Sequence, residues 1–127
     1  MRRLDSGLIL VIRFERRLLG LSTIINVITT ADGREALERL GRSLVERRLV
    51  ACLQVVGPIK SLYWWKGSIE EAEEWMAIMK TRGELYEQVE KEIKALHPYD
   101  VPEIMAVEAQ RVSEAYKEWV AAETQGP

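Results

Sequence analysis

Residues 49–81 read LVACLQVVGPIKSLYWWKGSIEEAEEWMAIMKT, and this stretch decides the fold. Two runs of strand-forming residues flank Lys66-Gly67, a pair typical of a tight turn because glycine adopts positive φ without steric cost. The stretch therefore predicts a long β-hairpin. Since proline cannot donate a hydrogen bond to a sheet, Gly57-Pro58 predicts a bulge or kink in the first strand.

The segment before the hairpin predicts a strand followed by a helix. Residues 22–30, STIINVITT, are rich in β-branched side chains and predict a buried strand. Asp32 is the expected N-cap of the helix that follows. Apolar residues then recur at helical spacing as far as about Arg48, with arginines and glutamates on the opposite face.

The segment after the hairpin predicts helix, strand and helix. Residues 84–96 carry one apolar face, and Pro98 ends the helix. Residues 102–112 predict a strand, and Ser113 is the expected cap of a short last helix. The order β-α-β-β-α-β-α is that of an α+β protein with a ferredoxin-like split βαβ sandwich. The apolar face expected on the helix at 84–96 consists of Leu85, Val89, Ile93 and Leu96.

Composition limits the class of protein. The 127 residues, 47% hydrophobic and 30% charged, suit one domain. A net charge of −2 argues against bulk attraction to nucleic acid or to an anionic membrane. The single cysteine, Cys52, cannot form a disulfide within the chain, which favours a reducing, cytoplasmic setting. It also excludes a zinc site built from several cysteines of one chain.

Residues 1–21 are predicted to lie outside the main domain, which we place at residues 22–127. Their apolar run, Leu8–Ile12, is shorter than the core of roughly 7–15 residues that a secretory signal needs. It is also far shorter than the about 20 residues that span a bilayer. We expect an N-terminal extension that is either an appended start or, alternatively, an added edge strand or an arm that packs on a partner.

The aromatic run Leu62–Trp65, LYWW, indicates self-association. Strand alternation places Tyr63 and Trp65 on one face and Leu62 and Trp64 on the other. A small domain rarely buries both faces of such a segment, and Trp and Tyr are enriched at interfaces. The run therefore predicts a homo-oligomer, the alternative being a single core with one exposed tryptophan.

Residues 97–103, HPYDVPE, contain the only histidine. Each residue before a proline is pushed toward extended geometry, so the stretch is a rigid corner that fixes His97, Tyr99 and Glu103. Such a corner suits a small-ligand site, although physical reasoning alone slightly favours a purely structural role. No pair of titratable groups takes acid and base roles, and Cys52 lies in an apolar strand, so we predict that the protein is not an enzyme.

Several motifs in the same order resemble the CutA family of divalent-cation-tolerance proteins, over roughly Ile24 to Trp119. They are LVERRLVACLQVV at 44–56, SLYWWKG at 61–67 with Glu74 seven residues later, Lys80-Thr81, and HPYDVPE. Two positions depart from the family's pattern. Gln54 stands where asparagine is common, and Lys66 stands where an acidic residue is usual.

The resemblance implies a ferredoxin-like subunit of a PII-like homotrimer, cytoplasmic and tolerant of divalent metals, with ligands bound in clefts between subunits. It implies copper(II) or another divalent cation as ligand and no organic cofactor, nucleic acid or membrane partner. The implied metal ligands are Cys52, His97 and Glu103, the first two suiting copper. The other implied cleft residues are Ser61, Tyr63, Trp65, Lys80 and Tyr99.

Two other functions stay open from the sequence. The trimer could bind a small anionic metabolite or a partner protein, with Lys80, Tyr63, Tyr99 and His97 as donors in the cleft. It could also be mainly a stable scaffold, since its many Glu, Lys and Arg residues suit surface ion-pair networks.

Overall fold

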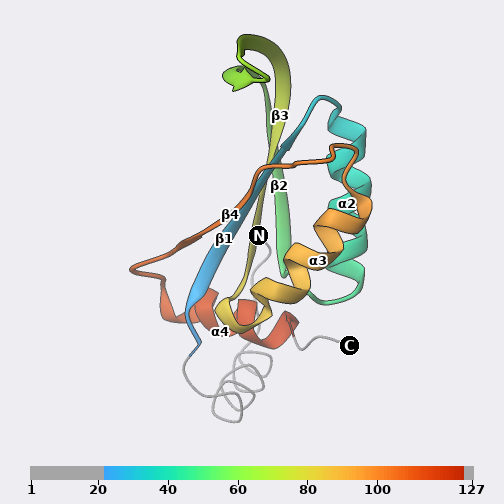
Figure 1. The fold of residues 1–127 in the computed structure, drawn as a ribbon. Coiled ribbons are helices and arrows are strands. Elements are labelled where there is room, and N and C mark those ends of the chain that lie inside the picture. The colour runs from blue at the N-terminus through green and yellow to red at the C-terminus, as the bar shows by residue number, and fades with distance from the viewer. Residues whose placement is uncertain (1–21, 125–127) are drawn as a thin grey trace.

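The computed structural model describes residues 22–124. Four strands form one antiparallel sheet in the order β2-β3-β1-β4 (Figure 1). This is the ferredoxin-like arrangement predicted from the sequence, with one helix added at the C-terminal end. The elements are β1 (Ile24–Ala31), α2 (Arg34–Glu46), β2 (Cys52–Trp65), β3 (Ser68–Arg82), a 3-10 turn (Gly83–Leu85), α3 (Tyr86–Leu96), β4 (Ile104–Glu108) and α4 (Glu114–Glu123).

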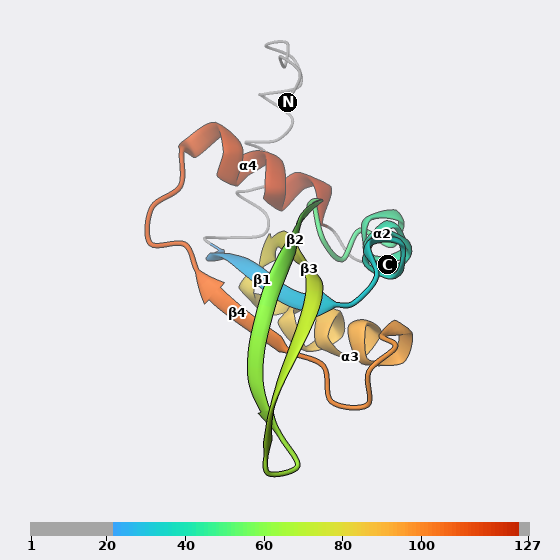
Figure 2. The same ribbon diagram turned by 90° about the horizontal axis from the view of Figure 1, so that it is seen from above.

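Two helices, α2 and α3, lie together on one side of the sheet, while α4 crosses one end of it (Figures 1 and 2). The core lies between the sheet and these two helices. Alternate side chains of β1 and β3 point into it, as the period of two in a strand requires. The members with no exposed surface at all are Val27, Ala31, Leu37, Leu44, Ala77, Met79, Val89 and Ile93.

The β2–β3 hairpin has the predicted turn and the predicted bulge. Lys66 and Gly67 adopt positive φ, 51° and 82°, as a two-residue turn between twisted strands requires. The β2–β3 register shifts between Val56 and Ile59. A Cβ atom on Gly57 would lie 2.7 Å from the ring of Trp75, so only glycine lets the strands approach this closely at the bulge.

Beyond the bulge the hairpin exposes large apolar side chains on both faces. Leu62 is 60% exposed, Trp64 72% and Ile69 61%. The hairpin extends away from the helices and touches no other described element near its turn (Figure 2). The apolar side chains between the sheet and the helices are thus covered within one chain, whereas those of the projecting hairpin are exposed.

Several local predictions are wrong at element ends. The N-cap of α2 is Gly33 rather than Asp32, and no side chain caps this helix. Leu96 is exposed, because α3 ends there and its last turn extends beyond the core. The strand predicted at 102–112 is limited to five residues, 104–108. The cap of α4 is confirmed, since the Tyr116 N–H donates to Ser113 Oγ at 3.4 Å.

The prediction for residues 1–21 lies outside the described residues. Among residues 22–124, none of the helices combines the length and the apolar character needed to cross a membrane.

Candidate functional site

The corner that follows α3 is held by its histidine. His97 has the expected extended backbone, φ −74° and ψ 139°, and its ring is buried. The Tyr99 N–H donates to His97 Nδ1 at 3.0 Å, so Nδ1 carries no proton. Nε2 then carries the proton and donates to the Thr30 carbonyl at 2.8 Å. Nδ1 therefore accepts a bond from within the corner, and Nε2 links the corner to β1.

The same corner is linked to the hairpin through Tyr99. Its hydroxyl donates to Glu74 Oε2 at 2.8 Å, and Glu74 is only 6% exposed. Burial first, and then the hydrogen bond to and the charge of Glu74, raise the pKa of Tyr99 well above its ordinary value. The phenol therefore stays protonated and acts as the donor that a buried carboxylate requires.

A second polar group lies around the start of β2. Leu53 and Val55 pack against the core, so strand alternation turns Cys52 and Gln54 toward the sheet face that α2 and α3 leave open. Cys52 is half-buried, and Lys80 lies opposite it on β3. The Lys80 ammonium donates to the side-chain oxygen of Gln54.

Cys52 also contacts the C-terminal helix. Its sulfur lies 3.4 Å from the hydroxyl of Tyr116. Burial first, and then the hydrogen bond to and the charge of Cys52, raise the pKa of Tyr116. The thiol is therefore covered on one side by α4, and it faces the open sheet surface beside Lys80 on the other.

The remaining predicted cleft residues lie on the open half of the hairpin. Ser61 is opposite Ala72, Tyr63 opposite Glu70 and Trp65 opposite Ser68. Tyr63 and Trp65 are exposed, as their alternation predicted for an interface. They lie beyond the bulge, separated from Cys52 and Lys80 along the same two strands.

The three predicted metal ligands do not form a cluster in one chain. Within residues 22–124, no group of three or more His, Cys, Asp or Glu side chains could hold a metal ion. Both nitrogens of His97 are already bonded to the backbone, whereas Glu103 lies exposed just before β4. A metal site on these residues would need ligands from more than one chain, and their assignment stays a prediction.

Two site residues were not assigned from the sequence, Glu74 as the partner of Tyr99 and Tyr116 as the partner of Cys52. Glu74 had one usable signal, because it is the last carboxylate before the apolar residues of β3 and lies in register with the bulge. Tyr116 had none beyond its place on the inward face of α4, since 64 positions separate it from Cys52.

The fold and these groups define a class: a ferredoxin-like α+β subunit with a half-buried thiol on an open sheet face and a rigid polar corner at the base of a projecting hairpin. Sequence comparison then gives the family. Residues 25–123 match the family described as CutA1 divalent ion tolerance protein, and the chain belongs to that family.

Individual relatives agree with this assignment. The chain is 42% identical over 101 residues to the divalent-cation tolerance protein CutA of Pyrococcus horikoshii, covering 80% of this chain and 98% of the relative. It is 39% identical over 94 residues to the CutA of Archaeoglobus fulgidus, covering 74% of this chain and 91% of the relative. The crystal structure of CutA1 from Oryza sativa superposes with a TM-score of 0.79 at 36% identity, over 82% of this chain and 95% of that one.

The family's name describes tolerance of divalent ions rather than a catalysed reaction. At that level the function implied by the sequence resemblance is confirmed. The metal, the assembly and the compartment are finer questions.

Proposed function

We propose that this chain forms a homotrimer that binds copper(II), or another divalent cation, between its subunits and thereby contributes to metal tolerance. One observation carries the proposal: the half-buried Cys52 lies on a sheet face that stays largely uncovered in the single chain. Exposed apolar side chains surround this face, on β2 at Val56 and on β4 at Met105 and Val107. Apolar surface of this kind marks an interface between proteins.

The chemistry of the ligands supports copper among divalent cations. A thiolate is a soft ligand and favours copper over hard cations such as magnesium. Because residues 22–124 of one chain contain no cluster of three ligands, rotational symmetry is the means by which Cys52 of one chain would meet ligands from a neighbour. Glu103, exposed at the start of β4, can join such a site without breaking a hydrogen bond among the described residues.

His97 is the costlier of the proposed ligands. It would have to release either the Tyr99 N–H or the Thr30 carbonyl to offer a lone pair to a metal. An unpaired buried backbone group costs about 1–3 kcal/mol. We therefore propose Cys52 and Glu103 as the first ligands, and His97 as a ligand only if the corner rearranges.

Calorimetric titration of copper(II) into the purified protein tests this proposal, with the oligomer mass measured on the same samples. We expect saturable binding in the wild type and its loss in Cys52→Ser at unchanged mass. Lys60→Ala is a control at an exposed position of the same strand, outside the predicted cleft residues, and it should bind as the wild type does. A trimeric wild type without saturable binding, or with equal binding after Cys52→Ser, would contradict metal binding at this site.

A second candidate function rests on Lys80. This half-buried ammonium is bonded to the neutral amide of Gln54, and no carboxylate pairs with it among the described residues. An anionic metabolite in the cleft could supply that charge, with the exposed Tyr63 as a further donor. A ligand at 100 times its Kd adds about 2.7 kcal/mol of stability. A thermal-shift screen of nucleotides and organic acids, repeated with Lys80→Met, distinguishes this from metal binding.

For the compartment we propose the cytoplasm, because an unpaired cysteine stays reduced there. Relatives differ in this respect, one being the chloroplastic CutA 1 of Oryza sativa and another the periplasmic CutA of Archaeoglobus fulgidus. Fractionation of source cells with an antibody to the protein would decide the question.

A further inference from the structure

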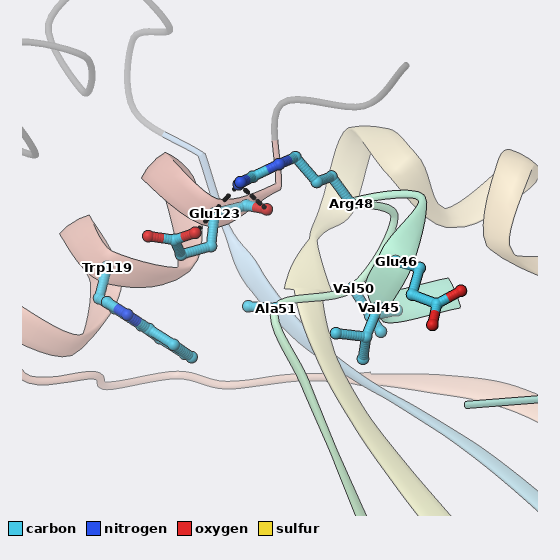
Figure 3. Close-up of a pocket in the computed structure, with 7 residues that line it drawn as sticks. All are labelled: Val45, Glu46, Arg48, Val50, Ala51, Trp119 and Glu123. Atoms are coloured by element: carbon cyan, nitrogen blue, oxygen red, sulfur yellow. Dashed lines mark hydrogen bonds and ion pairs between the residues drawn. The ribbon is translucent and has the colours of Figure 1, made fainter. Parts of the chain in front are cut away.

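A groove of about 280 Å³ lies between the end of α2, the residues just before β2, and α4 (Figure 3). Its apolar wall includes Val45, Val50 and Trp119, and the indole of Trp119 points from α4 toward the two valines. Glu46 and Glu123 supply carboxylates at its edge. The groove thus has one apolar wall and a charged rim, which also includes Arg48.

The rim is held by an arginine in an unusual backbone position. Arg48 has φ 57°, and the bonds Arg48 N–H to Val45 O and Leu49 N–H to Leu44 O, both 3.0 Å, close the end of α2. Glycine is the usual residue at this left-handed position. The guanidinium of Arg48 donates to Glu123 Oε2 at 3.0 Å and so joins the α2–β2 corner to α4.

Hydrogen bonds link the start of the described chain to the end of α4, which borders this groove. Ser22 Oγ donates to Glu84 Oε1 at 2.8 Å, and Arg82 donates to the same oxygen at 2.7 Å. Arg82 also donates to Thr124 Oγ1 at 3.0 Å, and Thr124 directly follows the groove residue Glu123. Ser22 is therefore fixed in one network with the end of α4. Leu8–Ile12 lie ten or more positions before Ser22. Ten extended residues span up to about 35 Å, so this apolar run can reach the groove from Ser22.

Residues 1–21 have the composition that this groove suits. They contain the apolar run Leu8–Ile12, then Phe14 and the pair Leu18-Leu19. They also carry five arginines against Asp5 and Glu15, whereas residues 22–127 carry thirteen Lys and Arg against eighteen Asp and Glu. The segment is therefore basic by three charges and the rest of the chain acidic by five, which favours association of the two.

We propose that the segment 1–21 docks into this groove of its own chain, with apolar side chains against Val45, Val50 and Trp119 and an arginine beside Glu46. The occupant follows from the reach, the apolar content and the charge of the segment. This inference is independent of metal binding, because the groove shares no residue with the proposed metal ligands. It assigns the extension the role of an intramolecular arm that covers the α2–β2–α4 junction.

Hydrogen–deuterium exchange of the full-length protein tests the docking. We expect amides within 8–19 to exchange at least about tenfold more slowly than in the free peptide 1–21, the factor that corresponds to about 1.4 kcal/mol. Val45→Glu should remove this protection, since it places a carboxylate in the apolar wall. Leu96→Glu is the matched control, as Leu96 is 47% exposed against 39% for Val45 and lies outside the groove. Free-peptide exchange rates in the wild type, or protection that survives Val45→Glu, would overturn the proposal.

Crosslinking identifies the occupant without depending on how the variants fold. A photoreactive amino acid at position 45 of the full-length protein is irradiated in a mixture of isotopically light and heavy chains. We expect crosslinks to residues 1–21 of the same chain. Crosslinks that join light to heavy chains would assign the groove to a neighbouring copy. Absence of any crosslink to 1–21 would leave it to a small ligand or another partner. Either result overturns the proposal.

Discussion

The two sides of the β-sheet differ in how far a single chain completes them. On the side of α2 and α3, large apolar side chains such as Leu37, Leu44 and Ile93 are fully buried. On the other side and along the projecting hairpin, apolar residues of similar size, among them Leu62 and Trp64, are exposed. The same alternation of side chains builds both sides. What differs is whether this chain supplies a covering layer.

The two sides of the sheet therefore have different roles, one in stabilising the subunit and the other in the proposed function. The helix-covered side holds the subunit together and contains none of the predicted site residues. The open side and the corner beside it contain Cys52, Lys80 and Tyr63, and the family's metal tolerance is proposed to act there. Substitutions on the two sides should therefore change different measured quantities.

The largest expected effect on subunit stability is in the helix-covered core. Leu37→Ala should lower the free energy of unfolding by about 2–5 kcal/mol, because the cavity at a fully buried leucine cannot collapse completely. Denaturant unfolding measures the change. Val101→Ala, at an exposed position, should change it by less than about 0.5 kcal/mol. Equal effects of the two substitutions would contradict the contrast between the two regions.

The next effect lies at the contact between the corner and the hairpin. Tyr99→Phe removes the only donor found for the buried Glu74 among residues 22–124, and should cost about 1–3 kcal/mol. Glu74→Gln in the same background should recover part of this loss, because a neutral amide is cheaper to bury than a carboxylate. Tyr63→Phe is the control at an exposed phenol. No cost for Tyr99→Phe would show that Glu74 finds another donor.

Stability should fall in alkaline solution. The pKa values of Tyr99 and Tyr116 are raised in the folded state, so their stabilising effect is present below the unfolded value of about 10 and lost as pH rises above it. The loss is at most about 1.4 kcal/mol per pH unit for each phenol, and less because both are partly exposed. Urea midpoints between about pH 9 and 11 measure it. Tyr99→Phe should reduce the slope, and an unchanged slope would exclude Tyr99 as a cause.

The smallest effect is expected at the groove rim. Arg48→Gly relieves a left-handed backbone conformation, worth about 1 kcal/mol, but loses an exposed ion pair with Glu123, worth up to about 1 kcal/mol. The two changes nearly cancel, so thermal unfolding should shift little. Arg48→Ala loses the ion pair and keeps the strain, and should be the less stable of the two variants.

The sequence predicted the layers of the fold better than the contacts between them. Strand periodicity and the Lys66-Gly67 turn were enough for the hairpin, and Gly57-Pro58 for its bulge. The N-cap was misassigned because Asp32 and Gly33 are both acceptable cap residues and only the backbone path chooses between them. The end of α3 at Leu96 was predicted correctly, but the place of Leu96 on the apolar face was misjudged, because helical spacing continues to Leu96 although the core does not.

The sequence indicated individual residues of the candidate site, but it did not indicate which side chains contact one another. The motifs indicated Cys52, Lys80, His97 and Tyr99, but their partners arise from tertiary contacts that no local pattern encodes. Tyr99 meets Glu74 across 25 positions, through the β2–β3 bulge and the corner together. The bond from His97 Nε2 to the Thr30 carbonyl likewise spans 67 positions, whereas the bond from the Tyr99 N–H to Nδ1 is local.

The central claim is that the open side is completed by other copies of this chain. Sedimentation equilibrium at micromolar concentration tests it most directly, on the wild type and on Leu62→Glu, which places a charge on the exposed hairpin without touching the core. We predict a mass three times that of the 14.6 kDa chain for the wild type, and a lower mass for the variant with its helix content unchanged. A wild type that sediments as a single 14.6 kDa chain would contradict the claim.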